Sequence, residues 1–281
     1  MPAADRDRVR RVSSRQNSFV KDLRRAFQHA ELVDRHCAIE GVRVIEEAVR
    51  SSLKFRAVFF ADSAEERMTK LLPQISSHAE VIALPDEVFQ SAVATETPQG
   101  IAALVRWPEF SLEKILAAEN QLLLGTMGIQ DPGNLGAIIR SAEAFGASAV
   151  LVGERTVAEF NAKAIRASAG SSFRLPTLHV KLADMRPLKD RGLRIAATSS
   201  HKGQPINDAD LTGPITVLVG SEGAGVPREY LNLADDFIRV PHSGRVESLN
   251  AAIAASVILY EAQRQRSIQH RDAARRIEKP I

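Results

Sequence analysis

The sequence contains a single cysteine, Cys37, and no long hydrophobic run. One cysteine excludes an intramolecular disulfide and agrees with a reducing cytoplasm. Most such cysteines are small buried hydrophobic side chains. No apolar stretch approaches the roughly 20 residues that span a bilayer. The basic N-terminus lacks the apolar centre of a secretory signal. These absences predict a cytoplasmic protein that does not enter a membrane.

Two ligand signatures are also missing. The seven histidines and one cysteine show no metal-ligand spacing; His29 and His36, seven residues apart, fall short of a zinc signature. No metal is therefore expected. The dinucleotide fingerprint Gly-x-Gly-x-x-Gly is absent from the first strand of the C-terminal half. That absence argues against a nicotinamide-dependent enzyme.

Basic side chains gather at both ends of a chain whose net charge is only +3. Residues 1–28 carry eight Lys or Arg against three acids, and residues 264–281 carry six against two. The middle of the chain is therefore net acidic. Two basic ends favour a polyanionic partner such as nucleic acid, although basic ends also occur as solubilising features.

The alternation of short apolar strands with helices predicts an α/β protein of two domains. Residues 1–107 read as a small α/β unit with helices at 16–29 and 41–50. Residues 108–119 form a linker with a short helix, residues 120–266 a second domain, and residues 267–281 a basic tail. The second domain is predicted to be an open parallel sheet, whose ligands bind beyond the carboxyl ends of the strands.

The first unusual loop of the second domain is "GTMGIQDPGNLGAIIRSAEAFGAS", which leads into a helix predicted over 134–145. Asn134 is a candidate N-cap, and Gly146 stands where a C′ glycine belongs. Arg140 points roughly opposite the apolar stripe of this helix, because successive residues turn by about 100°. Arg140 is therefore either a solvated surface residue or free for a role outside the core.

A second loop, "VLVGSEGAGVPREY", has three glycines in six residues directly after a strand. Such a loop can surround a ligand with backbone N–H and C=O groups. Glu222 within it would repel a phosphate, which argues against a nucleotide polyphosphate. A cationic or hydroxyl-bearing ligand is compatible with this loop.

The third stretch, "SGRVESLNAAIAASVILYEAQRQR", has Leu249, Ile253, Val257 and Tyr260 at helical spacing. It predicts a helix packed on nearly every side. Its first turn is nevertheless polar, with Ser248 and Asn250. These side chains either cap the helix or face a ligand at its N-terminus.

The ordered motifs "DPGNLGAIIRSAEAFGA", "LVGSEGAGVP" and "VPHSGRVESLNAAIAASVILYEA" resemble the SpoU (TrmH-like) branch of the SPOUT superfamily of RNA 2′-O-ribose methyltransferases. The first hundred residues, with "SRQNSFVKDLRRA", "EGVRVIEEAV" and "TPQGIAALV", are similar to the ribosomal-protein-like RNA-binding domain of its rRNA-modifying members. The resemblance implies a parallel sheet with a C-terminal trefoil knot, and a homodimer in which both subunits shape each site.

The resemblance also implies roles for individual residues. The catalytic group falls on Arg140, Asn134, Glu222, Ser248 and Asn250. The contacts to S-adenosyl-L-methionine, largely through the backbone, fall on Gly220, Val240 and Leu249.

Two positions depart from the family pattern. His242 replaces a common Met, and Ala252 replaces a frequent serine. Neither departure removes a matched catalytic residue. His242 is either a substrate contact or a loop side chain.

The expected activity is S-adenosylmethionine-dependent 2′-O-methylation of structured RNA, with 23S rRNA favoured and guanosine a candidate nucleoside. DNA is not expected as a partner. A tRNA methyltransferase and a non-catalytic RNA-binding or ribosome-assembly protein are the alternatives. Because the pKa of arginine exceeds about 12, Arg140 is expected to clamp a phosphate and stabilise the developing oxyanion instead of acting as a base.

Overall fold

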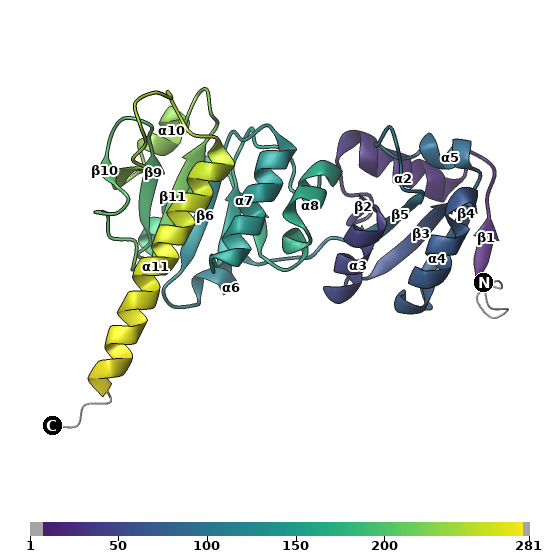
Figure 1. The fold of residues 1–281 in the computed structure, drawn as a ribbon, viewed down its shortest axis with the longest axis horizontal. Coiled ribbons are helices and arrows are strands. Elements are labelled where there is room, and N and C mark those ends of the chain that lie inside the picture. The colour runs from purple at the N-terminus through teal and green to yellow at the C-terminus, as the bar shows by residue number, and fades with distance from the viewer. Residues whose placement is uncertain (1–7, 278–281) are drawn as a thin grey trace. The chain divides into compact units, whose positions relative to one another are not determined.

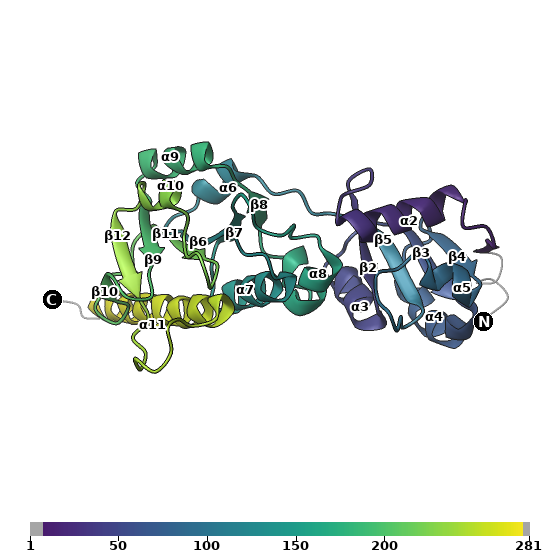
Figure 2. The same ribbon diagram turned by 90° about the horizontal axis from the view of Figure 1, so that it is seen from above.

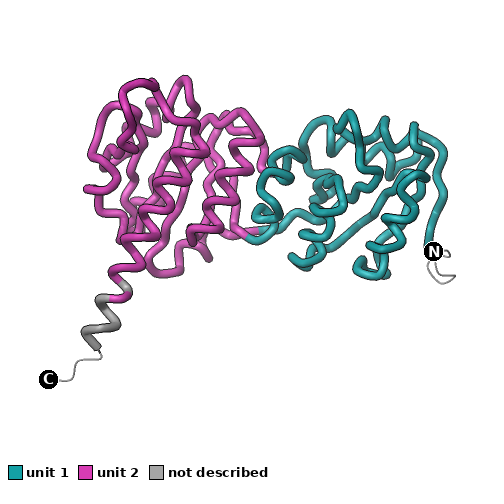
Figure 3. The backbone as a smooth tube through the Cα atoms, in the orientation of Figure 1, with its two compact units in different colours: residues 1–109, 160–174 teal, residues 110–159, 175–281 magenta. Residues whose placement is uncertain are grey.

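The computed structural model describes residues 8–277, and its contacts divide the chain into two compact units (Figure 3). Unit 1 holds the chain up to Glu109 together with Phe160–Arg174. Unit 2 holds Phe110–Glu159 and Leu175–Ile281. Over residues 8–277, no helix is both long and apolar enough to cross a membrane.

Unit 1 is a five-stranded mixed sheet in the order β1-β4-β3-β5-β2, with helices on both faces (Figures 1 and 2). Strand β5 is antiparallel to both of its neighbours, and the other pairs are parallel. The elements are β1 (Val9–Arg11), α2 (Ser18–His29), β2 (His36–Glu40), α3 (Val42–Arg50), β3 (Phe55–Ala61), η1 (Asp62–Ala64), α4 (Glu65–Leu71), η2 (Leu72–Gln74), β4 (Glu80–Leu84), α5 (Asp86–Gln90), β5 (Ile101–Arg106), α8 (Ala162–Ser168) and η3 (Ser171–Phe173).

Helix α2 shows how the local sequence determines an element of unit 1. The side chain of Asn17 caps the helix by accepting from the backbone N–H of Phe19 at 3.0 Å. Val20, Leu23 and Phe27 form its buried face at helical spacing. Cys37, on β2, is fully buried, and burial raises the pKa of its thiol to about 12. The predicted small hydrophobic role of this cysteine is confirmed.

The segment Phe160–Arg174 belongs to unit 1 although it interrupts the sequence of unit 2. Phe160 and Phe173 contact the ring of Trp107 edge-on, at centroid distances of 5.9 and 6.4 Å. Ile165 is fully buried in the core of unit 1. The continuous second domain expected over residues 120–266 is therefore not continuous in its contacts. The apolar side chains of this segment, such as Ile165 and Phe173, are buried in the core of unit 1.

Unit 2 is a seven-stranded sheet in the order β10-β12-β9-β11-β6-β7-β8, and every neighbouring pair is parallel. Figure 2 shows α7 and α11 on one face of the sheet, and α6, α9 and α10 on the other. The elements are α6 (Leu112–Leu116), β6 (Leu122–Met127), α7 (Pro132–Ala144), β7 (Ala149–Val152), β8 (Thr177–His179), α9 (Leu182–Asp190), β9 (Arg194–Thr198), β10 (Gln204–Pro205), β11 (Ile215–Gly220), α10 (Arg228–Leu231), β12 (Asp236–Arg239) and α11 (Ala251–Ile277).

The predicted open parallel sheet is confirmed, and its central strands are buried along their whole length, as parallel strands with covered faces are. Strand β8 begins at Thr177, directly after Pro176, which has no N–H to donate to the sheet. Helix α9 was not expected, and Pro187 inside it explains the weak signal. Most of the predicted tail continues α11 as a helix, and residues 278–281 lie outside the described part. The trefoil knot stays a prediction.

Candidate active site

The first and third motifs meet at the N-termini of two helices of unit 2, α7 and α11. Asp131 caps α7 by accepting from the backbone N–H groups of Gly133 and Asn134, at 2.6 and 3.0 Å. The expected cap, Asn134, is therefore wrong: Asn134 lies inside the first turn, where its side chain is available for other contacts. The C′ position of Gly146 is confirmed by its left-handed φ of 73°.

Asn250 caps the other helix, α11. Its Oδ1 accepts from the N–H groups of Ala252 and Ile253 at 3.0 and 3.2 Å. Its Nδ2 remains free to donate elsewhere, and donates to Asn134 Oδ1 and Glu222 Oε1, both at 3.1 Å. The capping role is therefore confirmed, and the same amide also joins the helix start to the other two motifs, because it has an acceptor and a donor end. A ligand-facing role stays a prediction.

The carboxylate of Glu222 joins the three motifs. Its Oε1 accepts from Asn134 Nδ2 at 2.7 Å, from Asn250 Nδ2 at 3.1 Å and from the backbone N–H of Ala251 at 3.3 Å. The negative charge also lies at the positive end of the α11 dipole. The acid that was unexpected in a glycine-rich loop therefore holds two helix starts together. We name Asn134, Glu222 and Asn250 the amide–carboxylate cluster.

A cavity of about 710 Å³ opens beside this cluster, within unit 2. It lies at the carboxyl ends of β9, β11 and β12, where a parallel sheet binds its ligands. Its volume lies in the range of about 300–1,000 Å³ that is typical of small-molecule sites. Its lining includes all three predicted cofactor contacts, together with Glu222 and Ser248 of the predicted catalytic group: Gly220, Val240, Leu249, Glu222 and Ser248.

The glycine-rich loop closes tightly over one side of this cavity. Gly225 donates its N–H to Ser221 O at 2.9 Å, so the loop folds back on the end of β11. A Cβ on Gly220 would lie only 2.0 Å from the carbonyl carbon of Gly225. Only glycine fits at position 220, since no rearrangement of a side chain could relieve a clash with backbone.

The cavity lining combines aliphatic and hydroxyl-bearing side chains. Val219, Val226 and Ile258 are aliphatic, whereas Thr198 and Ser199 carry hydroxyls. This mixture suits a ligand with a flat apolar ring and polar substituents. One of the two residues that depart from the family pattern, His242, also lines the cavity, and its Nδ1 lies 2.9 Å from Val240 O.

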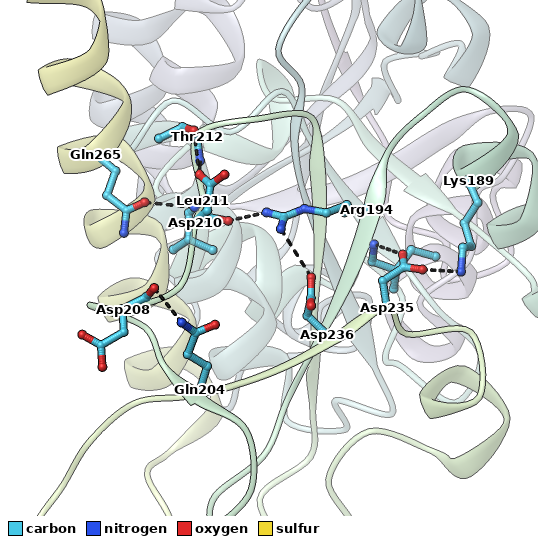
Figure 4. Close-up of polar contacts among 11 residues, drawn as sticks. Lys189, Arg194, Gln204, Asp208, Asp210, Leu211, Thr212, Asp235, Asp236 and Gln265 are labelled. Carbon is cyan, nitrogen blue, oxygen red and sulfur yellow. Dashed lines mark hydrogen bonds and ion pairs between the residues drawn. The ribbon is translucent and has the colours of Figure 1, made fainter. Parts of the chain in front are cut away.

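Polar contacts at the opposite ends of the same strands fix this half of the sheet (Figure 4). Arg194, at the start of β9, bonds to Asp210 O and lies 3.4 Å from a carboxylate oxygen of Asp236. Asp235 pairs with Lys189 at 2.6 Å and accepts from the backbone N–H of Ile195 at 2.9 Å. These contacts lie at the starts of the strands, at the end of the sheet opposite the cavity.

Arg140 does not line the cavity of its own chain. It is exposed on α7, six residues beyond Asn134, which is about 9 Å along the helix axis and about 120° around it. The next residue, Ser141, faces α11, where its Oγ shares a hydrogen bond of 2.7 Å with Ser256 Oγ. The structure therefore joins Asn134, Glu222 and Asn250 by hydrogen bonds and places Ser248 with Glu222 in the cavity lining, whereas Arg140 is not part of that lining.

Helix α11 is less buried than its sequence predicted. Ile253, Val257 and Tyr260 are 55%, 37% and 54% exposed, so the expectation of packing on nearly every side is wrong. The sheet and α7 bury the opposite side, which is rich in alanine, and within the described part of unit 2 the apolar stripe stays exposed. We name Ile253, Val257 and Tyr260 the α11 stripe. The ring of Tyr260 contacts Phe145 of α7 edge-on at 5.9 Å.

Fold and cavity together define an α/β enzyme domain of the SPOUT type, joined to a smaller α/β unit. Residues 121–260 match the SpoU rRNA Methylase family model, and residues 17–103 match the MRM3-like substrate binding domain. The chain belongs to the SpoU rRNA methylase family and is a methyltransferase.

Several relatives match nearly the whole chain. The 23S rRNA (guanosine(2553)-2′-O)-methyltransferase RlmP of Bacillus subtilis is 33% identical over 90% of this chain and 98% of its own length. The 23S rRNA (guanosine-2′-O-)-methyltransferase RlmB of Photobacterium profundum is 36% identical over 82% of this chain and 94% of its own. The SpoU methyltransferase AviRb of Streptomyces viridochromogenes, solved in complex with the cofactor AdoMet, superposes with a TM-score of 0.80 at 29% identity, covering 90% of this chain and 99% of its own.

Proposed function

We propose that the protein transfers a methyl group from S-adenosyl-L-methionine to a ribose 2′-oxygen of 23S rRNA, with guanosine the favoured nucleoside. The observation that carries this proposal is the amide–carboxylate cluster beside the cavity. Hydrogen bonds of 2.7–3.1 Å join side chains from three separate motifs there. The names of the relatives RlmP and RlmB support the substrate class.

The volume and the lining of the cavity are compatible with S-adenosyl-L-methionine. Gly220, Val240 and Leu249 would hold the cofactor through backbone groups and aliphatic contact, and Thr198 and Ser199 offer hydroxyls to its ribose. Glu222 accepts hydrogen bonds within the protein, and its charge is compatible with a cationic ligand. When bound, the cofactor supplies a methyl group that is already activated on a sulfonium, so the protein has to position the acceptor oxygen and stabilise its charge.

The amide–carboxylate cluster and Ser248 are the groups that hold the acceptor ribose in place. The cluster is already formed without substrate, because each of its members makes a hydrogen bond to another. Arg140 clamps an RNA phosphate and stabilises the developing 2′-oxyanion, a task suited to a guanidinium that stays charged. The planar fork of its donors matches a phosphate better than a lysine would.

Arg140 performs this task across a homodimer. The α11 stripe is an apolar surface next to α7, the helix that carries Arg140. A second copy that covers the stripe buries its apolar area and sets Arg140 at the cavity of the partner subunit. This arrangement would explain why Arg140 does not line the cavity of its own chain.

Unit 1 binds the structured RNA. Arg10, Arg15 and Lys21 are exposed there, in the basic first part of the chain. An enzyme that acts on ribosomal RNA works among ribosomes, so the cytoplasm expected from the sequence is part of this proposal. Reversing charges tests the RNA role better than truncation does, since removing residues 1–107 would strip the core around Ile165 and Phe173.

The deciding experiment maps ribose methylation in rRNA from a strain that lacks the gene. We expect one 2′-O-methyl group in 23S rRNA to disappear, and the purified protein to restore it with S-adenosylmethionine. Arg15→Glu with Lys21→Glu should weaken RNA binding without changing cofactor affinity. Methylation restored in tRNA instead would show the tRNA alternative to be correct, whereas no methylation and no cofactor binding would favour the non-catalytic alternative. Binding of NAD in a parallel titration would contradict the proposed cofactor.

A further inference from the structure

Thr156 lies in the loop after β7 and has no place in the motifs of the family resemblance. Its hydroxyl donates to Thr126 O at 2.8 Å. It also accepts from the backbone N–H groups of Gly128 and Ile129, at 3.0 and 3.3 Å. A hydroxyl offers one donor and two acceptor positions, so all three are used.

The two N–H groups that Thr156 binds belong to the turn between β6 and α7. The same loop supports this turn once more, since the N–H of Val157 donates to Ile129 O at 2.8 Å. Ile129 itself is buried, at 1% exposure. The loop after β7 therefore forms hydrogen bonds to both N–H and C=O groups of the β6–α7 turn.

This turn leads directly to the amide–carboxylate cluster. Asp131, two residues after Ile129, accepts from the N–H of Asn134 at 3.0 Å. Asn134 in turn donates to Glu222. A shift of the turn would therefore move the cap, the first turn of α7 and the amide of Asn134.

We propose that Thr156 is a positioning residue: its hydroxyl fixes the β6–α7 turn and thereby sets the place of Asn134 in the methyl-transfer site. The proposal rests on the proposed function, in which Asn134 holds the ribose. Thr156 itself touches neither the cavity nor the cluster. It acts on Asn134 through the β6–α7 turn and the Asp131 cap.

The matched variants are Thr156→Val and Thr156→Ser. Valine has the shape of threonine without the hydroxyl and leaves the N–H groups of Gly128 and Ile129 without their acceptor. Serine keeps the hydroxyl. We expect Thr156→Val to lower the single-turnover methylation rate by about 10- to 100-fold, since a misplacement of about 1 Å can cost on the order of 10²-fold. Thr156→Ser should retain the rate, and neither variant should change affinity for S-adenosylmethionine, measured by calorimetry.

A double-mutant cycle with Asn134→Ala separates positioning from a merely structural role. If Thr156 acts through Asn134, adding Thr156→Val to Asn134→Ala should lower the rate little further. Fully multiplicative losses in the cycle would overturn the proposal. So would a wild-type rate in Thr156→Val, or an equal loss of cofactor affinity.

Two further results decide the case in which Thr156→Val does not fold and the case in which the proposed function itself fails. If Thr156→Val does not fold, hydrogen exchange in the wild type decides: slow exchange of the Gly128 and Ile129 amides supports the proposal, and fast exchange contradicts it. If the wild type binds cofactor but methylates no RNA, the proposed function fails, whereas an active wild type with an equally active Thr156→Val removes only this inference.

Discussion

Substitution of Asn250 separates the two tasks that its side chain performs. The Oδ1 atom caps α11 through Ala252 and Ile253, and Nδ2 joins Asn134 to Glu222. Asn250→Ala removes both tasks. Asn250→Ser keeps a good N-cap, because a serine hydroxyl accepts from the first turn, but it lacks the amide donor that reaches the cluster.

The two variants should differ in stability and agree in activity. Loss of the cap in Asn250→Ala should lower the free energy of unfolding by about 1 kcal/mol, within a range of roughly 0.5–2 kcal/mol. In a domain of this size that loss lowers Tm by roughly 2–4 °C. Asn250→Ser should unfold close to the wild-type temperature. Both variants should lose methylation rate, because the cluster lacks its amide donor in each.

Differential scanning calorimetry and single-turnover methylation of unmodified 23S rRNA measure these two quantities on the same preparations. Asn250→Asp provides a third comparison: it caps well, but places a second carboxylate beside Glu222, where like charges repel. Its rate should fall further than that of Asn250→Ser. If Asn250→Ser methylates at the wild-type rate, the polar start of α11 is only a cap, and the reasoning about the cluster is refuted.

Three further predictions concern other parts of the molecule. Arg140→Ala should lower turnover by about 10²–10³-fold, the usual cost of removing a donor to a developing oxyanion, with cofactor affinity unchanged by calorimetry; comparable losses in both quantities would contradict the role of Arg140. Val257→Glu should convert the proposed homodimer to a monomer in sedimentation, because it places an unpaired charge on the α11 stripe, and an unchanged sedimentation coefficient would exclude that interface. The ion pair between His179 and Glu159, at 3.4 Å, raises the pKa of His179. Its stabilisation is therefore fully present below the ordinary histidine pKa and is lost as pH rises through the raised value. Glu159→Gln should remove this dependence from melting curves recorded across that range, and identical curves for both proteins would refute the assignment.

The sequence by itself determined the parallel sheet of unit 2 and marked the loops that border the cavity. Buried β-strands and amphipathic helices leave a periodic record in the chain, and a strand followed by a glycine-rich or polar loop marks a binding edge. Gly146 could be placed at a helix end for a similar reason, since the requirement for a left-handed φ is local. The buried state of Cys37 followed from residue type alone.

Tertiary structure alone decided how these residues interact. Asn134 and Glu222 are 88 positions apart, and Asn250 and Asn134 are 116 apart. No local pattern records which of their donors and acceptors meet. The exposure of Ile253 and Tyr260 could not be predicted from the sequence either, because helical spacing shows that a stripe is apolar but not which surface covers it.

The same limit explains the segment Phe160–Arg174, which lies between strands of unit 2 along the chain and packs in the core of unit 1. The position of Arg140 apart from the cavity is a further case. Local propensity and periodicity act over a few residues, whereas the partner of a buried or charged side chain is set by the path of the whole chain.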